Sequence, residues 1–189
     1  LSGCGVQDGS EIHEAVCALL EIARNDAEAV CIAPNLPQYD VVDHAKGSVT
    51  SERRNMLTEA ARIARGKIRD IREIKATDLD AVILPGGFGA AKNLCDFAIA
   101  GAGCSVNPDL ERLLVEMHAS GKPIGAICIA PTILARVFGK KGISVQVTIG
   151  TDPETSAKIK EMGAEPADRQ AREICVDRSN RIVTTPAYM

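Results

Sequence analysis

Aromatic residues are scarce in this chain of 189 residues: it has no Trp, three Phe and two Tyr. Its formal net charge is only -3, and residues of both signs are spread along the sequence. Proteins that bind nucleic acid usually present a basic surface and, for single strands, aromatic rings on which bases stack. The sequence therefore disfavours a nucleic-acid partner.

The chain also lacks a long apolar run. Residues 124–135 carry no charge, but this stretch is far too short to cross a bilayer and is interrupted by Pro131. No segment combines a basic start with an apolar core, which is the pattern of a secretory signal. We therefore expect no membrane-spanning helix and no membrane partner.

None of the seven cysteines forms a C-x-x-C pair, and an odd number cannot close completely into disulfides. This predicts free thiols in a reducing compartment, and we expect the cytoplasm. Cys17 and Cys31 lie in apolar periodic runs, so we interpret them as buried structural residues, and we interpret Cys95 and Cys104 in the same way.

Short aliphatic runs alternate with longer stretches of helical period, which is typical of parallel strands joined by crossover helices. The sequence therefore predicts an α/β sandwich with a mostly parallel sheet. No repeat, low-complexity tract or linker divides it, so we expect a single domain over residues 1–189. The predicted strands are residues 29–33, 79–84, 122–127, 144–149, 174–176 and 181–184. The predicted helices are residues 11–24 capped by Ser10, 51–65, 90–98, 107–121 opened by Asn107 and Pro108, and 153–162, with a loop over residues 35–49.

Cys128 is the main candidate nucleophile. In open α/β sheets ligands gather at the carboxyl ends of the strands, and Cys128 directly follows an apolar strand and precedes Pro131, which suits the first turn of a helix. Small residues, Ala126 and Ala130, stand two positions on either side, as a sharp strand-to-helix elbow requires. A sulfur at a helix N-terminus is biased toward thiolate. The alternatives are that Cys128 is a buried structural thiol, or that Cys4, after the first strand remnant, is the reactive one.

The Pro85-Gly86-Gly87 turn is expected to supply main-chain donors for an oxyanion, because glycine lets the backbone approach a ligand closely. We expect the N–H groups of Gly87 and Ile129 to act as these donors, with Gly86 beside them. A dinucleotide site at residues 87–89 is disfavoured, because Lys92 stands where the fingerprint requires glycine.

Several motifs resemble the ElbB glyoxalase family, also called enhancing lycopene biosynthesis or sigma cross-reacting protein, a branch of the PfpI/deglycase group. They are LSGCGVQDGSEIHEAV at residues 1–16, PGGFGAAKNL at 85–94, GKPIGAICIAP at 121–131, TIGTD at 148–152 and IVTTPAYM at 182–189. The resemblance covers nearly the whole chain. It implies a flavodoxin-like, class I glutamine amidotransferase-like fold that lacks most of the first strand and a C-terminal helix here.

The resemblance further implies a homodimer, no metal or organic cofactor, and conversion of glyoxal to glycolate, with a link to isoprenoid biosynthesis and to repair of glycated groups. Cys128 matches the elbow cysteine of such proteins. Superfamily members pair that cysteine with a glutamate from the first helix, for which this chain offers Glu11 and Glu14. We prefer Glu14, which lies one turn into the helix, and expect it to stay protonated beside a thiolate. Glu11 is better explained by the helix dipole.

A catalytic histidine is missing from the position where many superfamily members carry one, because residues 147–152 read VTIGTD. This puts glutamine hydrolysis in doubt, since an amidotransferase cysteine needs an imidazole to carry its proton. Among His13, His44 and His118, only His13 is a candidate proton carrier, although it points about 100° away from Glu14 on a helix. The alternative is a surface or dimer-contact residue.

Taken together, these features predict a cofactor-independent glyoxalase whose Cys128 thiolate attacks a small dicarbonyl substrate, with Glu14, and with His13 as a further candidate, serving the proton steps. The alternative from another class is a redox-sensing or regulatory binding protein, in which Cys128 is oxidised by peroxide and catalysis is incidental.

Overall fold

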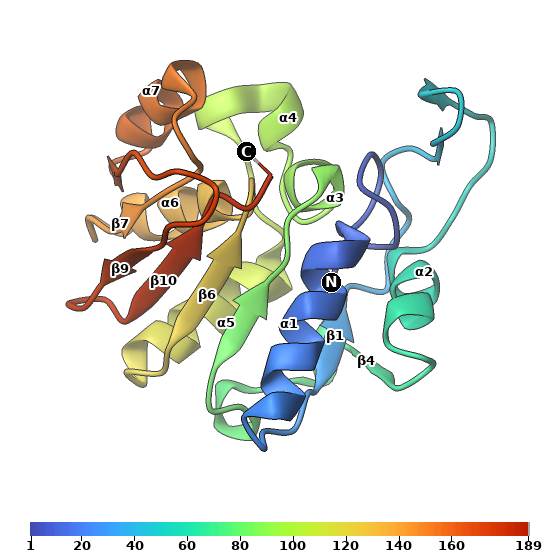
Figure 1. The fold of residues 1–189 in the computed structure, drawn as a ribbon, viewed down its shortest axis with the longest axis horizontal. Helices are drawn as coiled ribbons and strands as arrows, with labels where there is room; N and C mark the ends of the chain where they lie inside the picture. Colours follow the sequence, from blue (N-terminus) through green and yellow to red (C-terminus); the bar gives the residue numbers. More distant parts are fainter. Residues whose placement is uncertain (189) are drawn as a thin grey trace.

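Short strands and helices alternate along residues 1–188, the part of the chain that the computed structural model describes (Figure 1). The helices are α1 (Ile12–Arg24), α2 (Met56–Ile63), α3 (Phe88–Lys92), α4 (Phe97–Ala100), α5 (Pro108–Ala119), α6 (Pro131–Gly139) and α7 (Pro153–Glu161). Single 3₁₀ turns are η1 (Ile71–Glu73), η2 (Ala76–Asp78) and η3 (Gly101–Gly103). The strands are β1 (Cys31–Ala33), β2 (Val42–Asp43), β3 (Ser48–Val49), β4 (Ile68–Asp70), β5 (Val82–Leu84), β6 (Ile124–Ile127), β7 (Gln146–Val147), β8 (Glu165–Pro166), β9 (Cys175–Asp177) and β10 (Ile182–Thr185).

The main sheet has the order β5-β6-β10-β9, with β5, β6 and β10 parallel and β9 antiparallel to β10. A second pair, β1 and β4, is also parallel. In the main sheet, Leu84, Ala126 and Thr184 lie in register, so the carboxyl ends of three strands meet at one edge. The predicted α/β fold with a mostly parallel sheet is confirmed.

The largest apolar cluster lies where α5 and α6 pack on β6. Leu113, Leu114 and Met117 from α5 and Phe138 from α6 are fully buried. α5 begins where the sequence predicts, because the Asn107 side chain accepts hydrogen bonds from the N–H groups of Asp109 and Leu110. This packing fixes β6, the strand that leads to Cys128.

An elongated apolar cavity of about 620 Å³ separates β1 from β5. Helix α1 covers it, and Leu1 stands at its edge, with its amino nitrogen donating a 2.8 Å hydrogen bond to the carbonyl of Ile32. Within the described residues, β1 pairs only with β4 and β5 only with β6, so two strand edges face each other across this cavity. That the first strand of the domain belongs here stays a prediction.

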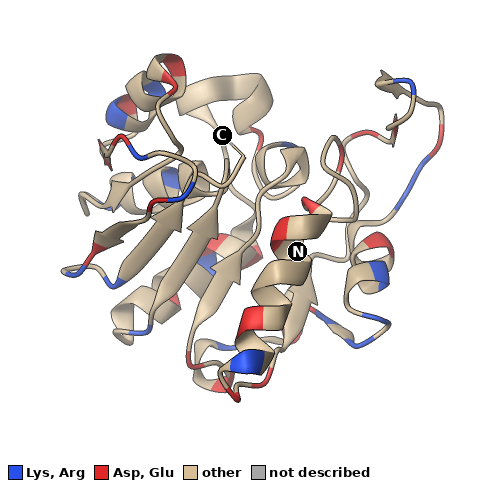
Figure 2. Cartoon of the chain, in the orientation of Figure 1, with Lys and Arg blue, Asp and Glu red and all other residues tan. Residues whose placement is uncertain are grey.

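One face of the main sheet carries exposed apolar side chains. Ile83, Val183 and Val176 lie in one register row with Gly125 between the first two, and each of the three side chains is exposed. Ile12, Val16 and Leu20 form an exposed stripe along α1. Figure 2 shows charged residues of both signs around the outside of the fold, mainly on helices and loops and few on the central strands.

Several predicted boundaries differ from the structure. The helix predicted over residues 51–65 begins at Met56, because Asn55 and not Ser51 provides the side-chain cap. Residues 90–98 form no single helix: α3 ends at Lys92 and α4 begins at Phe97, because Cys95 pairs with Val106 in an isolated antiparallel bridge. The expected loop at residues 35–49 contains the β2–β3 hairpin, and β4 and β8 were not predicted.

Candidate functional site

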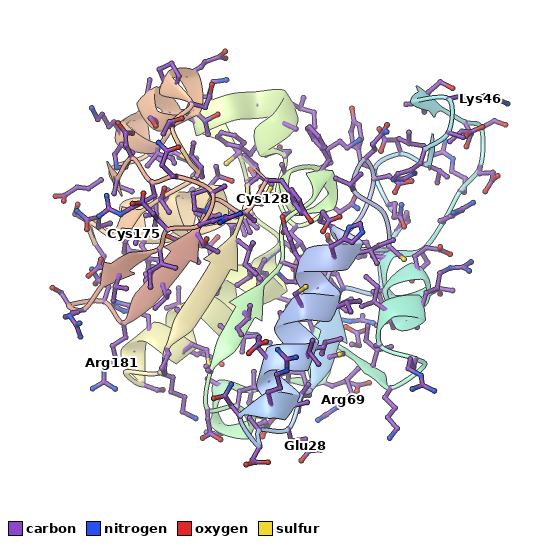
Figure 3. All side chains as sticks on the ribbon, viewed as in Figure 1. Glu28, Lys46, Arg69, Cys128, Cys175 and Arg181 are labelled. Atoms are coloured by element: carbon purple, nitrogen blue, oxygen red, sulfur yellow. The ribbon has the colours of Figure 1, made fainter. Side chains whose placement is uncertain are left out.

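Cys128 stands on a sharp elbow between β6 and α6. Its φ of 60° lies in the left-handed region, which is uncommon for a residue with a side chain. The N–H of Cys128 donates a 2.9 Å hydrogen bond to the carbonyl of Thr185 at the end of β10, which holds the elbow at the edge of the sheet. Figure 3 places Cys128 beyond the carboxyl end of β6, facing the region between α1 and α3. The sequence prediction of an elbow is therefore confirmed.

The sulfur of Cys128 is surrounded by polar groups and is only half-buried. The backbone N–H groups of Gly87 and Ile129 and the Glu14 carboxyl lie near enough to influence its pKa. Both donors that we expected near an oxyanion thus lie close to the sulfur. Cys128 is not a structural thiol packed among aliphatic side chains.

Glu14 is buried, with 6% of its surface exposed, although it carries a carboxyl group. Its Oε2 accepts a 2.7 Å hydrogen bond from the N–H of Gly86. Its Oε1 is buried and has no hydrogen-bond partner among the described residues. Burial raises the pKa of Glu14, and the nearby charge of Glu11 adds to this effect, while the Gly86 and Cys128 hydrogen bonds oppose it. A carboxyl with one free buried oxygen is well placed to accept a proton.

Burial, followed by the negative charge of Glu14, raises the pKa of Cys128 to about 11. The hydrogen bonds from Gly87 and Ile129 act in the opposite direction but do not compensate. The expected resting thiolate is therefore wrong, because the helix N-terminus does not outweigh burial beside a carboxylate. Burial raises both pKa values, so each group of the pair holds its proton more tightly than it does in the unfolded chain.

The glycines around the pair allow three segments of the chain to touch. A Cβ atom on Gly86 would lie 2.5 Å from the Cβ of Cys128 and 2.9 Å from Oε2 of Glu14. Gly87 has a φ of 87°, and a Cβ there would lie 2.4 Å from the N of Glu11. No side chain fits at either position, and this explains why the turn after β5 consists of glycines.

Glu11, and not Ser10, caps helix α1. Its Oε2 accepts a 2.7 Å hydrogen bond from the N–H of Glu14, and its own N–H donates to the carbonyl of Gly86. Ser10 is instead buried, and its Oγ accepts a hydrogen bond from the N–H of Ser2. Glutamate is an unusual N-cap residue, which is why the sequence pattern favoured serine.

His13 does not contact the cysteine–glutamate pair. Its Nδ1 lies 2.7 Å from Oε1 of Glu11, its side chain is 76% exposed, and its ring meets that of Tyr188 edge-on at 6.4 Å. The Glu11 hydrogen bond raises the pKa of His13. A catalytic role of His13 stays a prediction. In that role, His13 exchanges protons with the site through Glu11 or with a bound substrate.

The other histidines lie elsewhere. His44 hydrogen-bonds with the Val42 carbonyl and the Gln7 N–H, and His118 with the Asn180 side chain. In residues 1–188, no histidine therefore partners Cys128, in agreement with the missing histidine of the sequence.

The sequence missed two residues that help to build the site: Thr185, which anchors the elbow through its carbonyl, and Gly9, whose carbonyl accepts a hydrogen bond from the N–H of Gly89. Both lie in quoted motifs, but a main-chain contact leaves no signal of its own in the side-chain pattern.

The remaining cysteines differ partly from expectation. Cys17 is exposed on α1 and Cys31 is half-buried, whereas Cys95 and Cys104 are buried as expected. Burial raises the pKa of Cys4, which has no N–H groups beside its sulfur of the kind found at Cys128.

Among the described residues, no group of three or more His, Cys, Asp or Glu side chains could hold a metal ion, and no helix is long and apolar enough to cross a membrane.

Comparison with known proteins links the whole chain to one family. The model described as the DJ-1/PfpI family matches residues 5–187. A human protein named glutamine amidotransferase-like class 1 domain-containing protein 3, mitochondrial, is 49% identical over 199 residues, which cover 100% of this chain and 73% of that protein. The rat protein named ES1 protein homolog, mitochondrial, is 48% identical over the same shares of the two chains.

A solved structure from Ehrlichia chaffeensis is also similar. It is described as an isoprenoid biosynthesis protein with an amidotransferase-like domain, and it superposes with a TM-score of 0.93 at 40% identity, over 100% of this chain and 85% of the other.

The names of the human and rat relatives correct one expectation: both are called mitochondrial, so the cytoplasmic location inferred from the free thiols is wrong. Free thiols indicate a reducing environment but do not identify which compartment provides it.

Proposed function

The chain belongs to the DJ-1/PfpI family, and from this premise we propose that it is a cofactor-independent glyoxalase acting through Cys128. Its substrate is glyoxal or a related small dicarbonyl, and its product is the corresponding hydroxy acid. The observation that carries the proposal is the placement of the Cys128 thiol and the buried Glu14 carboxyl together against Gly86 at the mouth of the sheet. Such a pair combines a nucleophile with a general base within direct reach.

In the first step, the sulfur of Cys128 attacks one aldehyde carbon while Glu14 takes the thiol proton. The carbon–sulfur bond forms, the carbonyl π bond breaks, and the proton passes on to the new alkoxide, which gives a neutral hemithioacetal. Once the sulfur has become a thioether, the N–H groups of Gly87 and Ile129 no longer face an anion there. They are then free to stabilise the oxygen that develops beside it.

In the second step, Glu14 removes the proton from the hemithioacetal carbon while the neighbouring aldehyde oxygen takes up a proton, which gives an enediol. A proton then adds to the former aldehyde carbon, and the hydroxyl on the sulfur-bearing carbon loses its proton to become the thioester carbonyl. This internal redox change converts the hemithioacetal into a thioester of the hydroxy acid. Water then adds to the thioester, the carbon–sulfur bond breaks, and Cys128 leaves with a proton. The sum is one dicarbonyl plus water giving one hydroxy acid, so no external oxidant or cofactor is needed.

Within the family we place the chain in the ElbB-like branch, on the motifs around residues 85–94 and 121–131. Two features support this assignment: the glycine turn that seats Glu14 and the elbow lacking a nearby histidine. The link to isoprenoid biosynthesis is part of the same proposal, and the description of the Ehrlichia protein agrees with it. Activity on glycated groups would use the same hemithioacetal chemistry.

A redox-sensing role of Cys128 is a weaker alternative. Peroxide oxidises the thiolate, so cysteines that sense peroxide have low pKa values. Cys128 is half-buried with a raised pKa, so its thiolate exists only when Glu14 holds the proton. Glutamine hydrolysis is also disfavoured, because no imidazole is available at the pair to carry a proton to ammonia.

A homodimer stays part of the proposal. The exposed stripe of Ile12, Val16 and Leu20 on α1 and the apolar row around Val183 offer a surface on which a second copy can pack. Light scattering after size exclusion tests this directly, and a monomer at micromolar concentration would contradict it.

The decisive experiment is glyoxal turnover, followed by proton NMR so that loss of glyoxal and formation of glycolate are both observed. We expect turnover by the wild type and none by Cys128→Ala. Cys17→Ala, which removes an exposed thiol on α1, serves as the matched control and should behave like the wild type. Unchanged glycolate formation by Cys128→Ala would refute the proposal.

A further inference from the structure

Cys95 and Cys104 form a buried dithiol away from the elbow. Cys95 is 5% exposed and Cys104 is 0% exposed, and the two thiols lie near enough that each shifts the pKa of the other. Cys95 also contacts the carbonyl of Ala90 in α3, at 3.3 Å. The glyoxalase chemistry uses neither thiol, so their proximity calls for a separate explanation.

The backbone explains why the two sulfurs meet. Cys95 pairs with Val106 in an antiparallel bridge, and hydrogen bonds from Asn107 to Leu94 and from Asp96 to Ser105 extend this pairing on both sides. Cys104 lies two residues before Val106 and therefore on the same face of its segment. Diagonal neighbours of this kind bring side chains within contact distance. The eight residues between the thiols contain only α4 and η3, both short.

The surroundings make the two thiols unequal. Arg136 from α6 donates to the carbonyl of Cys104, and its positive charge, with that of Lys140, lies near this sulfur. The hydrogen bond from Cys95, followed by these charges, lowers the pKa of Cys104, whereas the same hydrogen bond and burial raise the pKa of Cys95. Cys104 is thus the better nucleophile, and Cys95 keeps the proton.

We propose that Cys95 and Cys104 are a redox-active pair that closes into an intramolecular disulfide when a hydroperoxide reaches it. The thiolate of Cys104 attacks the peroxide, its O–O bond breaks, and a sulfenic acid and an alcohol or water result. The Cys95 thiol then attacks that sulfur, the S–O bond breaks, and water leaves with the Cys95 proton. Two thiols lose two electrons and one peroxide gains them, so the reaction is balanced.

Access to the buried pair comes through the α4–η3 segment. Ile99 is 56% exposed and Gly103 is exposed, and a Cβ atom on Gly103 would meet nothing within 4 Å. Gly101, with a φ of 57°, lies between α4 and the Cys104 end of this segment. The segment is not part of the main sheet, but Phe97 and Ala102 pack into the core, so a peroxide reaches Cys104 through local opening of the segment.

The test uses the wild-type protein and two probes, hydrogen peroxide and diamide. After treatment, free thiols are blocked with N-ethylmaleimide and the protein is digested. Lys92 and Arg112 are the only tryptic sites that bound residues 93–112, so both cysteines fall on one peptide. We expect this peptide to lose about 2 Da and to take up no maleimide, because two hydrogens have been removed. Cleavage before Asp96 should leave two fragments joined only through sulfur.

Variants separate this pair from the other thiols. Cys95→Ala and Cys104→Ala should each abolish the loss of mass, while Cys175→Ala, which removes another buried thiol, should not. If either alanine variant fails to fold, the mass of the wild-type 93–112 peptide after oxidation still tests the proposal. Two maleimide groups on the 93–112 peptide after oxidation, at a dose that oxidises the exposed Cys17, would overturn the proposal. So would a disulfide that joins Cys95 or Cys104 to a different cysteine.

Discussion

The N–H of Gly86 donates a 2.7 Å hydrogen bond to Oε2 of Glu14, and this contact directs the other oxygen of the carboxyl into the buried space around Cys128. The carboxyl is thereby fixed by main chain and needs no second side chain to orient it. The position of the general base thus depends on the glycine turn after β5, and several measurable consequences follow from this dependence.

Gly86→Ala should be strongly destabilising. Its Cβ atom would lie 2.5 Å from the Cβ of Cys128 and 2.8 Å from the carbonyl oxygen of Ile127, so backbone must move. We expect a loss of about 2 kcal/mol or more in the free energy of unfolding, measured by urea denaturation. Gly103→Ala, at an open position, is the control and should change stability little. Equal stability of the two variants would contradict the observed crowding.

Glu14→Gln should separate two effects of the carboxyl, namely its action as a base and the effect of its charge on the pKa of Cys128. Without its base, glyoxal turnover should fall by about 10²-fold or more. The charge of Glu14 raises the pKa of Cys128, so its removal should lower that pKa from about 11. Peptide-resolved alkylation by iodoacetamide across pH measures this shift. A Cys128 pKa that stayed the same or rose in the variant would show that Glu14 is not charged beside the thiol.

The pH dependence of stability should report the same pair. The pKa of Cys128 is raised from 9.0 in the unfolded chain to about 11 in the folded protein. A raised pKa means that the folded state holds its proton more tightly, so this contribution is complete below pH 9 and is lost as pH rises toward 11. Wild type should therefore lose more stability over this range than Cys128→Ala, as measured by urea denaturation at fixed pH.

Glu11→Ala should weaken helix α1 by about 1 kcal/mol, because the N–H of Glu14 loses its capping partner. His13→Ala is the matched control, since His13 is exposed and contacts Oε1 of Glu11 and the Tyr188 ring but not the capping oxygen. Thermal unfolding of the two variants gives the comparison. If His13→Ala also reduced glyoxal turnover while leaving stability intact, the role of His13 as a proton carrier would be supported.

The cavity between β1 and β5 should accept one more parallel strand. A strand that ends at Leu1, followed by α1 and then β1, forms a right-handed βαβ unit, the usual connection between parallel strands. Adding five β-branched residues before Leu1 should raise the melting temperature by about 5 °C or more. A Gly/Ser extension of equal length is the control, and equal melting temperatures would count against the strand.

The sequence predicted the elements that carry strong local signals. Asn107 and Pro108 mark the start of α5 correctly, and the small residues around Cys128 identify the elbow. It missed β4, which is only three residues long and contains two charged residues, and the break between α3 and α4, which depends on a bridge to distant Val106. Both require knowledge of which segments lie side by side.

The chemistry of the site was predictable only in part. The sequence selected Glu14 by its position on the helix, and the structure places this carboxyl against Gly86 beside Cys128, while its role as the catalytic partner stays a prediction. The sequence could not tell whether Glu14 or Cys128 holds a proton. The two pKa values depend on burial, on the N–H groups near the sulfur and on the neighbouring carboxylate, and these effects depend on distances that no sequence pattern contains. The mitochondrial names of the relatives likewise have no counterpart in the cysteine pattern.

One consequence of the shared proton concerns selectivity and product release. When the Cys128–Glu14 pair holds one proton, on sulfur or on oxygen, it carries a single negative charge in a poorly solvated position. A neutral dialdehyde enters without electrostatic cost, whereas a 2-oxo acid would be repelled by its own carboxylate. The hydroxy acid formed from the dialdehyde is itself an anion, so hydrolysis of the thioester creates like charges at close range. The completed reaction thereby drives its product back into water.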